Sequence, residues 1–142
     1  MTAKILVIDD DPSLVALLTA NLEEENYKVI SGYDGQMAIH LALTHLPNLI
    51  LLDVNMPMTN GLKAMESIRK NEKTMHIPII LITGEASDTV FPHAETAARV
   101  THIKKPVDLE ELNSLIRQVL KKYPPRVSPS PPVLAARPPA DR

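Results

Sequence analysis

Four aspartates are the side chains of this sequence best able to do chemistry. Asp9, Asp10 and Asp11 follow one short apolar run, and Asp53 directly follows another. Carboxylates that are crowded together repel one another and raise each other's pKa unless a cation neutralises them. A few oxygen ligands that leave room for water and phosphate oxygens suit Mg²⁺ (or Mn²⁺) better than a closed Ca²⁺ cage, and nothing indicates a zinc site. Asp11 precedes Pro12, and we interpret it as a helix cap.

Asp53 is placed where an unpartnered charge is costly, at the end of an apolar strand. A carboxylate next to a metal in a water-poor setting can attack phosphorus and form an acyl phosphate. Lys105 offers a cation to carboxylate or phosphoryl oxygens, whereas Lys104 is expected to point the other way. The Lys105-Pro106 bond is a candidate cis peptide. Thr83, followed by Gly84, offers a hydroxyl and an accessible backbone N–H, although threonine is also common in ordinary strands.

The elements that position these residues are five short apolar runs that alternate with helical patterns. The runs are Ile5–Ile8, Val29–Ile30, Leu49–Leu52, Ile79–Ile82 and a weaker one at Val100–Ile103. Continuous apolar character indicates strands that are covered on both faces, as in a parallel sheet between helices. The pattern predicts a doubly wound, three-layer α/β sandwich, which binds ligands outside the carboxyl ends of its strands. Asp9, Asp10, Asp53, Thr83 and Lys105 would then share one rim.

Five helices are expected between and after these strands. Apolar spacing predicts them around 14–22, 38–42, 62–68 and 109–119, with a short one in 86–99 that Pro92 interrupts. Asp11-Pro12 has the form of a helix cap followed by proline at the first helical position. Asp108, with Glu111 three residues later, resembles a capping box.

Composition divides the chain into residues 1–122 and a tail, residues 123–142. The tail holds seven of the 13 prolines, three arginines and one aspartate, which predicts a disordered or polyproline-like extension or linker. Without the tail, residues 1–122 carry 12 basic and 16 acidic side chains, a net charge of −4. This balance disfavours direct nucleic-acid or membrane binding by bulk charge. The lack of cysteine, of a signal peptide and of a membrane-length apolar run favours a cytoplasmic protein.

Four sequence blocks occur in a characteristic order. They are Ile-Asp-Asp-Asp-Pro, Asp-Val-Asn-Met-Pro-Met-Thr-Asn-Gly beginning at Asp53, Pro-Ile-Ile-Leu-Ile-Thr ending at Thr83, and Lys105-Pro106. Over about residues 3–122 the chain resembles the response-regulator receiver family of two-component and phosphorelay systems. The resemblance implies a flavodoxin-like five-stranded parallel sheet of order 2-1-3-4-5. It also implies a phosphoryl donor, which is a histidine kinase or a histidine phosphotransfer protein, and a protein that assists only its own phosphorylation and dephosphorylation.

The resemblance also implies a role for each residue that matches the family's motifs. The implied roles are Asp53 as phosphoacceptor, Asp10 as direct metal ligand, Asp9 as a metal ligand through water, Asn55 as a backbone-carbonyl ligand, Thr83 as switch hydroxyl and Lys105 as contact to the phosphoryl oxygens. Asn55 and Glu85 match positions that tune the lifetime of the acyl phosphate. Since neither side chain blocks water with bulk, we expect fairly rapid self-dephosphorylation.

Some positions depart from the family pattern. His102 stands where the family usually has Tyr or Phe that swings inward with the threonine, and it is either a buried switch partner of Thr83 or an ordinary edge-strand histidine. Ala98-Arg99 replaces a common Gly-Ala, and Pro92 falls in the fourth helix. The face formed by the fourth helix, fifth strand and fifth helix is where a downstream protein target is expected, and these departures make it unusual.

Two other functions compete with the phosphoacceptor. A haloacid-dehalogenase-like phosphatase would use Asp9 as nucleophile and Asp11 as acid/base, but Pro12 and the redundant Asp53 motif argue against it. A degenerate receiver that binds partners without phosphorylation is conceivable because of His102. Retention of every acidic and basic site residue argues against this second alternative.

Overall fold

The computed structural model describes residues 2–54, 61–84 and 99–125, and these contain one five-stranded parallel sheet. The strands are β1 (Lys4–Ile8), β2 (Lys28–Gly32), β3 (Leu49–Asp53), β4 (Ile79–Thr83) and β5 (Val100–Lys104). Their spatial order is β2-β1-β3-β4-β5. The predicted strands and their order are therefore confirmed, and each apolar run lies within one strand.

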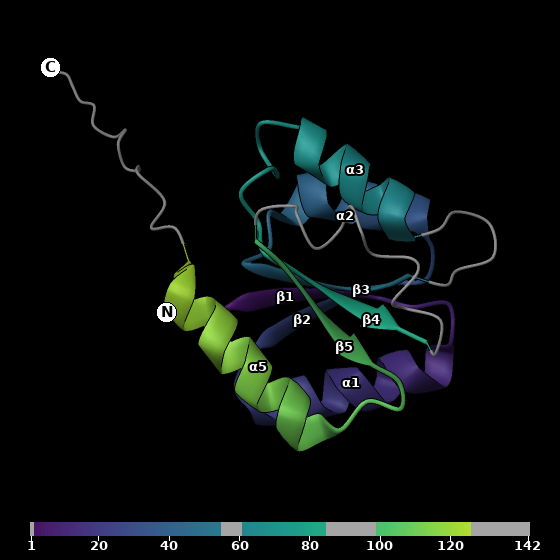
Figure 1. Cartoon of the computed structure of the whole chain (residues 1–142), viewed down its shortest axis with the longest axis vertical. Coiled ribbons are helices and arrows are strands. Elements are labelled where there is room, and N and C mark those ends of the chain that lie inside the picture. The colour runs from purple at the N-terminus through teal and green to yellow at the C-terminus, as the bar shows by residue number, and fades with distance from the viewer. Residues whose placement is uncertain (1, 55–60, 85–98, 126–142) are drawn as a thin grey trace, which may run out of the picture.

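Helices cover both faces of the sheet, which makes the predicted three-layer sandwich (Figure 1). The helices of the described residues are α1 (Pro12–Glu24), α2 (Gly35–His45), α3 (Gly61–Lys70) and α5 (Leu109–Lys122). In Figure 1, α2 and α3 lie on one face of the sheet, and α1 and α5 lie on the other. The fifth expected helix, in 86–99, falls almost entirely outside the described residues.

The core has two halves because successive strand residues point to opposite faces. In β1, Leu6 and Ile8 pack in the cluster under α2 and α3, whereas Ile5 and Val7 pack under α1 and α5. All residues of β3 and β4 are buried. These two strands lie in the middle of the sheet, which explains their continuous apolar character.

Aspartates begin three of the helices. The Asp11 side chain accepts a hydrogen bond from the Ser13 N–H, with Pro12 at the first helical position. Asp108 accepts from the Glu111 N–H, and Asp34 does the same for α2. The two predicted caps are confirmed, and each satisfies an N–H that would otherwise have no partner inside its helix.

Strand register decides which residues meet at the carboxyl edge. Asp53 pairs with Ile82, one residue before Thr83, and Thr83 pairs with Lys104, one residue before Lys105. The carboxyl ends of parallel strands meet at one edge, so these side chains lie together as predicted.

In the described part of the chain, no helix is both long and apolar enough to cross a bilayer. Helix α5 ends at Lys122, where the sequence predicts the tail to begin.

Candidate functional site

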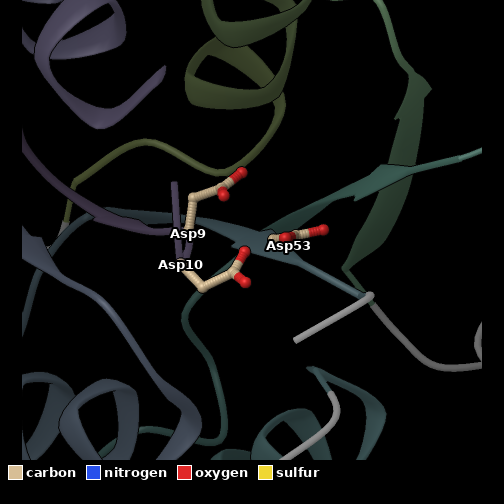
Figure 2. A group of neighbouring side chains, drawn as sticks. All are labelled: Asp9, Asp10 and Asp53. Atoms are coloured by element: carbon tan, nitrogen blue, oxygen red, sulfur yellow. The ribbon is translucent and has the colours of Figure 1, made fainter. Parts of the chain in front are cut away.

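Three carboxylates gather at the carboxyl ends of β1 and β3. One oxygen each from Asp9, Asp10 and Asp53 lies within 4.8 Å of the other two. Figure 2 shows the three side chains grouped at the ends of these two neighbouring strands. Asp9 and Asp53 are fully buried, whereas Asp10 is exposed. The group is thus buried on one side and open to solvent on the other.

Burial places an electrostatic cost on the Asp9 carboxylate. Its Oδ1 accepts a hydrogen bond from the Asp11 N–H at 2.9 Å, but its buried Oδ2 accepts none. Burial, and to a lesser degree the neighbouring Asp53 and Asp10 carboxylates, raises the pKa of Asp9 from 3.8 to about 6. The Asp11 hydrogen bond and the Lys105 ammonium act in the opposite direction.

Lys105 brings one positive charge to this group. Its Nζ lies 3.5 Å from Asp53 Oδ1 and 3.6 Å from Asp9 Oδ2, and about a third of its side chain is exposed. The Lys105 N–H donates to the Thr83 carbonyl at 2.7 Å, which ties the residue to the end of β4. The Lys105-Pro106 peptide bond is cis, as the sequence analysis suggested. Lys104 is exposed, also as expected.

The donor set fits a hard divalent cation. Three carboxylates against one ammonium leave a net charge of −2 when all four groups are ionised, and a divalent ion would neutralise it. Among the described residues the buried Asp9 Oδ2 accepts no hydrogen bond and has the Lys105 ammonium 3.6 Å away, so it retains capacity to accept a cation or a water. All three donors are oxygens, the ligands that Mg²⁺ and Mn²⁺ prefer.

Thr83 is buried at the end of β4 beside this group. Its hydroxyl donates to the Ile103 carbonyl of β5 at 3.3 Å, so it faces the neighbouring strand in this structure. A long hydrogen bond of this kind is weak and can be exchanged for another acceptor.

The remaining predicted residues have different outcomes. His102 is exposed on β5, which places its imidazole outside the core in this structure. Its predicted role, as a switch partner of Thr83 or as an ordinary edge-strand histidine, stays a prediction. Asn55 and Glu85 lie outside the described residues, so their predicted roles stay predictions.

Gly32 is a residue of the site's surroundings that sequence reasoning did not single out. It ends β2, and its carbonyl accepts the Asp9 N–H at 3.3 Å. A Cβ at this position would lie 2.7 Å from Ile8 Cδ1 and 3.0 Å from Leu41 Cδ1. The absence of a side chain lets the end of β1 and helix α2 approach β2. A glycine at the end of a predicted strand was the available signal.

Comparison with known proteins agrees with this geometry. Residues 5–117 match the family described as the response regulator receiver domain. The curated response regulator ArlR of Staphylococcus aureus is 39% identical over 122 residues, which cover 85% of this chain and 54% of that protein. The chain thus spans about half the length of the curated relatives it matches.

Solved structures share both the fold and part of the sequence. Chemotaxis protein CheY4 of Vibrio cholerae is 27% identical with a TM-score of 0.79, over 84% of this chain and all of that one. The receiver domain of the sensor histidine kinase PA1611 of Pseudomonas aeruginosa is 26% identical with a TM-score of 0.77, over 85% of this chain and 99% of that one. That structure has a magnesium ion coordinated in its active-site cleft.

Proposed function

This chain belongs to the response regulator receiver family of two-component signalling, and we propose that it accepts a phosphoryl group on Asp53. The observation that carries the proposal is the contact of one ammonium with two buried carboxylates. Lys105 Nζ lies 3.5 Å from Asp53 and 3.6 Å from Asp9, next to a third carboxylate on Asp10. A purely structural ion pair needs one carboxylate for each ammonium. The two additional carboxylates here leave a negative charge that a cation would neutralise.

Mg²⁺ or Mn²⁺ is the cofactor that we propose for this site. Asp10 and Asp53 would hold the ion directly, Asp9 through water, and Asn55 through its backbone carbonyl. When bound, the ion supplies charge neutralisation for the carboxylates and for the incoming phosphoryl oxygens. The magnesium-bound receiver of PA1611 supports this assignment by its similarity.

The phosphoryl donor would be a phosphohistidine of a histidine kinase or a phosphotransfer protein. An Asp53 carboxylate oxygen attacks phosphorus, an O–P bond forms, and the N–P bond to the histidine breaks. The leaving imidazole nitrogen keeps the electron pair of the broken bond. Lys105 stabilises the phosphoryl oxygens as a point charge, and hydrolysis of the acyl phosphate by water later restores Asp53.

Readout of the phosphorylated state would begin at Thr83. Its hydroxyl would exchange the 3.3 Å hydrogen bond to Ile103 for a phosphoryl oxygen, which changes how the end of β4 is held against β5. We propose that a downstream protein binds the face that includes β5 and α5. The exposed His102 on β5 belongs to that face rather than to the interior.

One experiment tests the phosphoacceptor. The full chain is incubated with a small phosphodonor and Mg²⁺, and phospho-aspartate is located by mass spectrometry of wild type, Asp53→Asn and Asp9→Asn. We expect the phosphoryl group on Asp53 and its loss in Asp53→Asn. Phosphorylation that survives Asp53→Asn but is lost in Asp9→Asn would favour the phosphatase. No phosphorylation of the wild type would favour the degenerate receiver.

A further inference from the structure

A second concave surface lies at the opposite end of the sheet from the carboxylates. It is a groove of about 1060 Å³ at the amino ends of the strands. Residues that precede or begin β1, β3, β4 and β5 contribute to it, together with the end of α5. We call it the amino-end groove. None of the residues assigned to the phosphoacceptor site lines it, so its function is separate from that site.

The walls of the amino-end groove combine apolar surface with cations. Leu43 and Leu46 at the end of α2 are large apolar side chains that remain 36% and 48% exposed. Exposed leucines that share one groove indicate a surface that another molecule covers. Ile77 and Pro78 add buried apolar residues before β4.

Positive charge surrounds this apolar surface. Lys73, Arg99 and Lys122 line the groove, and none of them pairs with a carboxylate among the described residues. Lys4 also lines it, but its ammonium donates to the His45 carbonyl. Glu72 is the single acidic side chain of the lining. This excess of cations contrasts with residues 1–122 as a whole, which carry a net charge of −4.

A further guanidinium reinforces the positive charge behind the groove. Arg69 Nη2 donates to the Arg99 carbonyl at 3.3 Å, whereas the buried Nε and Nη1 atoms of Arg69 donate to no acceptor among the described residues. Burial and the nearby Arg99 charge lower the pKa of Arg69 to about 10, so it stays protonated at neutral pH. Among the described residues neither Arg69 nor Arg99 pairs with a carboxylate, so the positive charge of both is uncompensated, and of the two Arg99 lines the groove.

We propose that the amino-end groove docks an acidic peptide segment of a partner protein, with apolar side chains interspersed among its carboxylates. The carboxylates would face Lys73, Arg99 and Lys122, and the apolar side chains would cover Leu43 and Leu46. Charge complementarity selects this occupant over the chain's own tail. The tail leaves the fold at Pro124 and Pro125, which line the groove, but residues 126–142 carry three arginines and one aspartate.

Nucleic acid fits the groove less well than an acidic peptide. Binding of single strands depends on aromatic faces that stack with bases. Tyr123 is the aromatic ring of the lining, and Arg99 lies over it at 4.4 Å from the ring centroid, with Lys122 at 5.4 Å. These cations lie over the Tyr123 ring, where a base would stack. The two exposed leucines have no group that binds the phosphates of a nucleic-acid backbone.

Matched charge reversals test the proposal. Lys73→Glu with Lys122→Glu alters the groove, whereas Lys70→Glu with Lys121→Glu makes the same charge change on exposed lysines that do not line it. The probe is a short fluorescein-labelled peptide in which glutamate and leucine alternate, titrated against the full chain by fluorescence anisotropy. Circular dichroism melting of both double variants checks that they remain folded.

We expect the groove reversals to weaken peptide binding by about tenfold or more, because two attractions become repulsions, and the control reversals to leave it unchanged. Amide chemical shifts should change at Leu46, Lys73 and Lys122 rather than at Asp9 and Lys105. Absence of binding, or equal loss in both double variants, would overturn the proposal. Equally tight binding of a single-stranded oligonucleotide, or of a lysine–leucine peptide, would overturn it as well.

Discussion

Lys105 Nζ lies 3.5 Å from Asp53 Oδ1 and approaches Asp9 at nearly the same distance, so one ammonium is shared by two buried carboxylates. That shared position gives the ammonium two opposite effects. It partly neutralises the carboxylates when no cation is present, and it repels a divalent ion that enters the same group. It also attracts the phosphoryl oxygens that follow.

Lys105→Met should therefore separate metal binding from phosphorylation. Removing the ammonium leaves a more negative site, and we expect Mg²⁺ affinity to rise by about three- to tenfold, as measured by isothermal titration calorimetry. The rate of phosphorylation from a small phosphodonor should fall, because the phosphoryl oxygens lose a positive partner. Lys104→Met, on the exposed neighbour, is the control and should change neither quantity. A fall in Mg²⁺ affinity for Lys105→Met would contradict this reasoning.

Metal binding should weaken in mild acid because of Asp9. With a pKa of about 6, the Asp9 carboxyl takes up a proton as the pH falls below 6 and must release it when a cation binds. We expect the apparent Mg²⁺ affinity to be nearly constant above pH 7 and to fall by up to about tenfold per pH unit below 6. Titrations at several pH values would show this; a midpoint near pH 4 would contradict it.

The stability of the metal-free protein should also depend on Asp9, but it should rise rather than fall as the pH is lowered. The pKa of Asp9 is higher in the folded chain than its ordinary value of 3.8, so the folded state binds the proton more tightly. Its contribution is most favourable below about pH 4 and is lost as the pH rises through 6, a change of roughly 3 kcal/mol. Melting temperatures without metal should fall between about pH 4 and 6. Asp9→Asn should remove much of that fall, and saturating Mg²⁺ should also oppose it.

Asp10 and Asp11 are adjacent exposed aspartates with different expected roles. Asp10→Ala removes an oxygen of the carboxylate group, so we expect Mg²⁺ affinity to fall by about tenfold or more with little loss of stability. Asp11→Ala removes the cap of α1 and should cost about 1 kcal/mol of unfolding free energy with metal binding retained. Calorimetry and chemical denaturation of both variants check the two quantities. Equal changes in Mg²⁺ affinity and in unfolding free energy for both variants would refute the assignment.

Asn21 and Asn113 join α1 to α5 by reciprocal amide hydrogen bonds of 2.7 and 3.2 Å. Removing either amide leaves its partner without these bonds in a partly buried position. We expect Asn21→Ala and Asn113→Ala each to cost about 1–2 kcal/mol, and the double variant to cost less than the sum. Denaturation curves measure these values. Phosphorylation of Asp53 should be unaffected, because the pair lies away from the strand ends.

Local patterns were sufficient to predict the parts of this molecule that depend on near neighbours in sequence. The apolar runs identify β1, β3 and β4 because a strand buried on both faces tolerates few polar residues, and the edge strands β2 and β5 carry shorter or weaker runs. Asp11-Pro12 and Asp108 identify two helix starts because a cap acts within three residues. Asp53 ends a strand that is buried on both faces, so its place at the carboxyl edge of the sheet follows from the run that precedes it.

Features made by distant segments were not available in the sequence. The amino-end groove brings together Leu46 after α2, Lys73 after α3 and Lys122 at the end of α5. Neither lysine is unusual when its position is read along the chain. Arg99 has a φ of 63°, and its place over Tyr123 depends on how β5 meets the end of α5. In the sequence, Arg99 therefore stands out only as a departure from the family pattern.

The sequence alone determined the sheet, its strand ends and the presence of carboxylates, a hydroxyl and an amine at one edge. These follow from hydrophobic periodicity and from the rule that parallel strands end together. Tertiary structure decided the rest: the 3.5 Å contact of Lys105 with Asp53, the high pKa of Asp9, the exposed position of His102 and the cationic groove at the other end. Distances, burial and electrostatic potential depend on packing between elements far apart in sequence, and only the folded chain sets them.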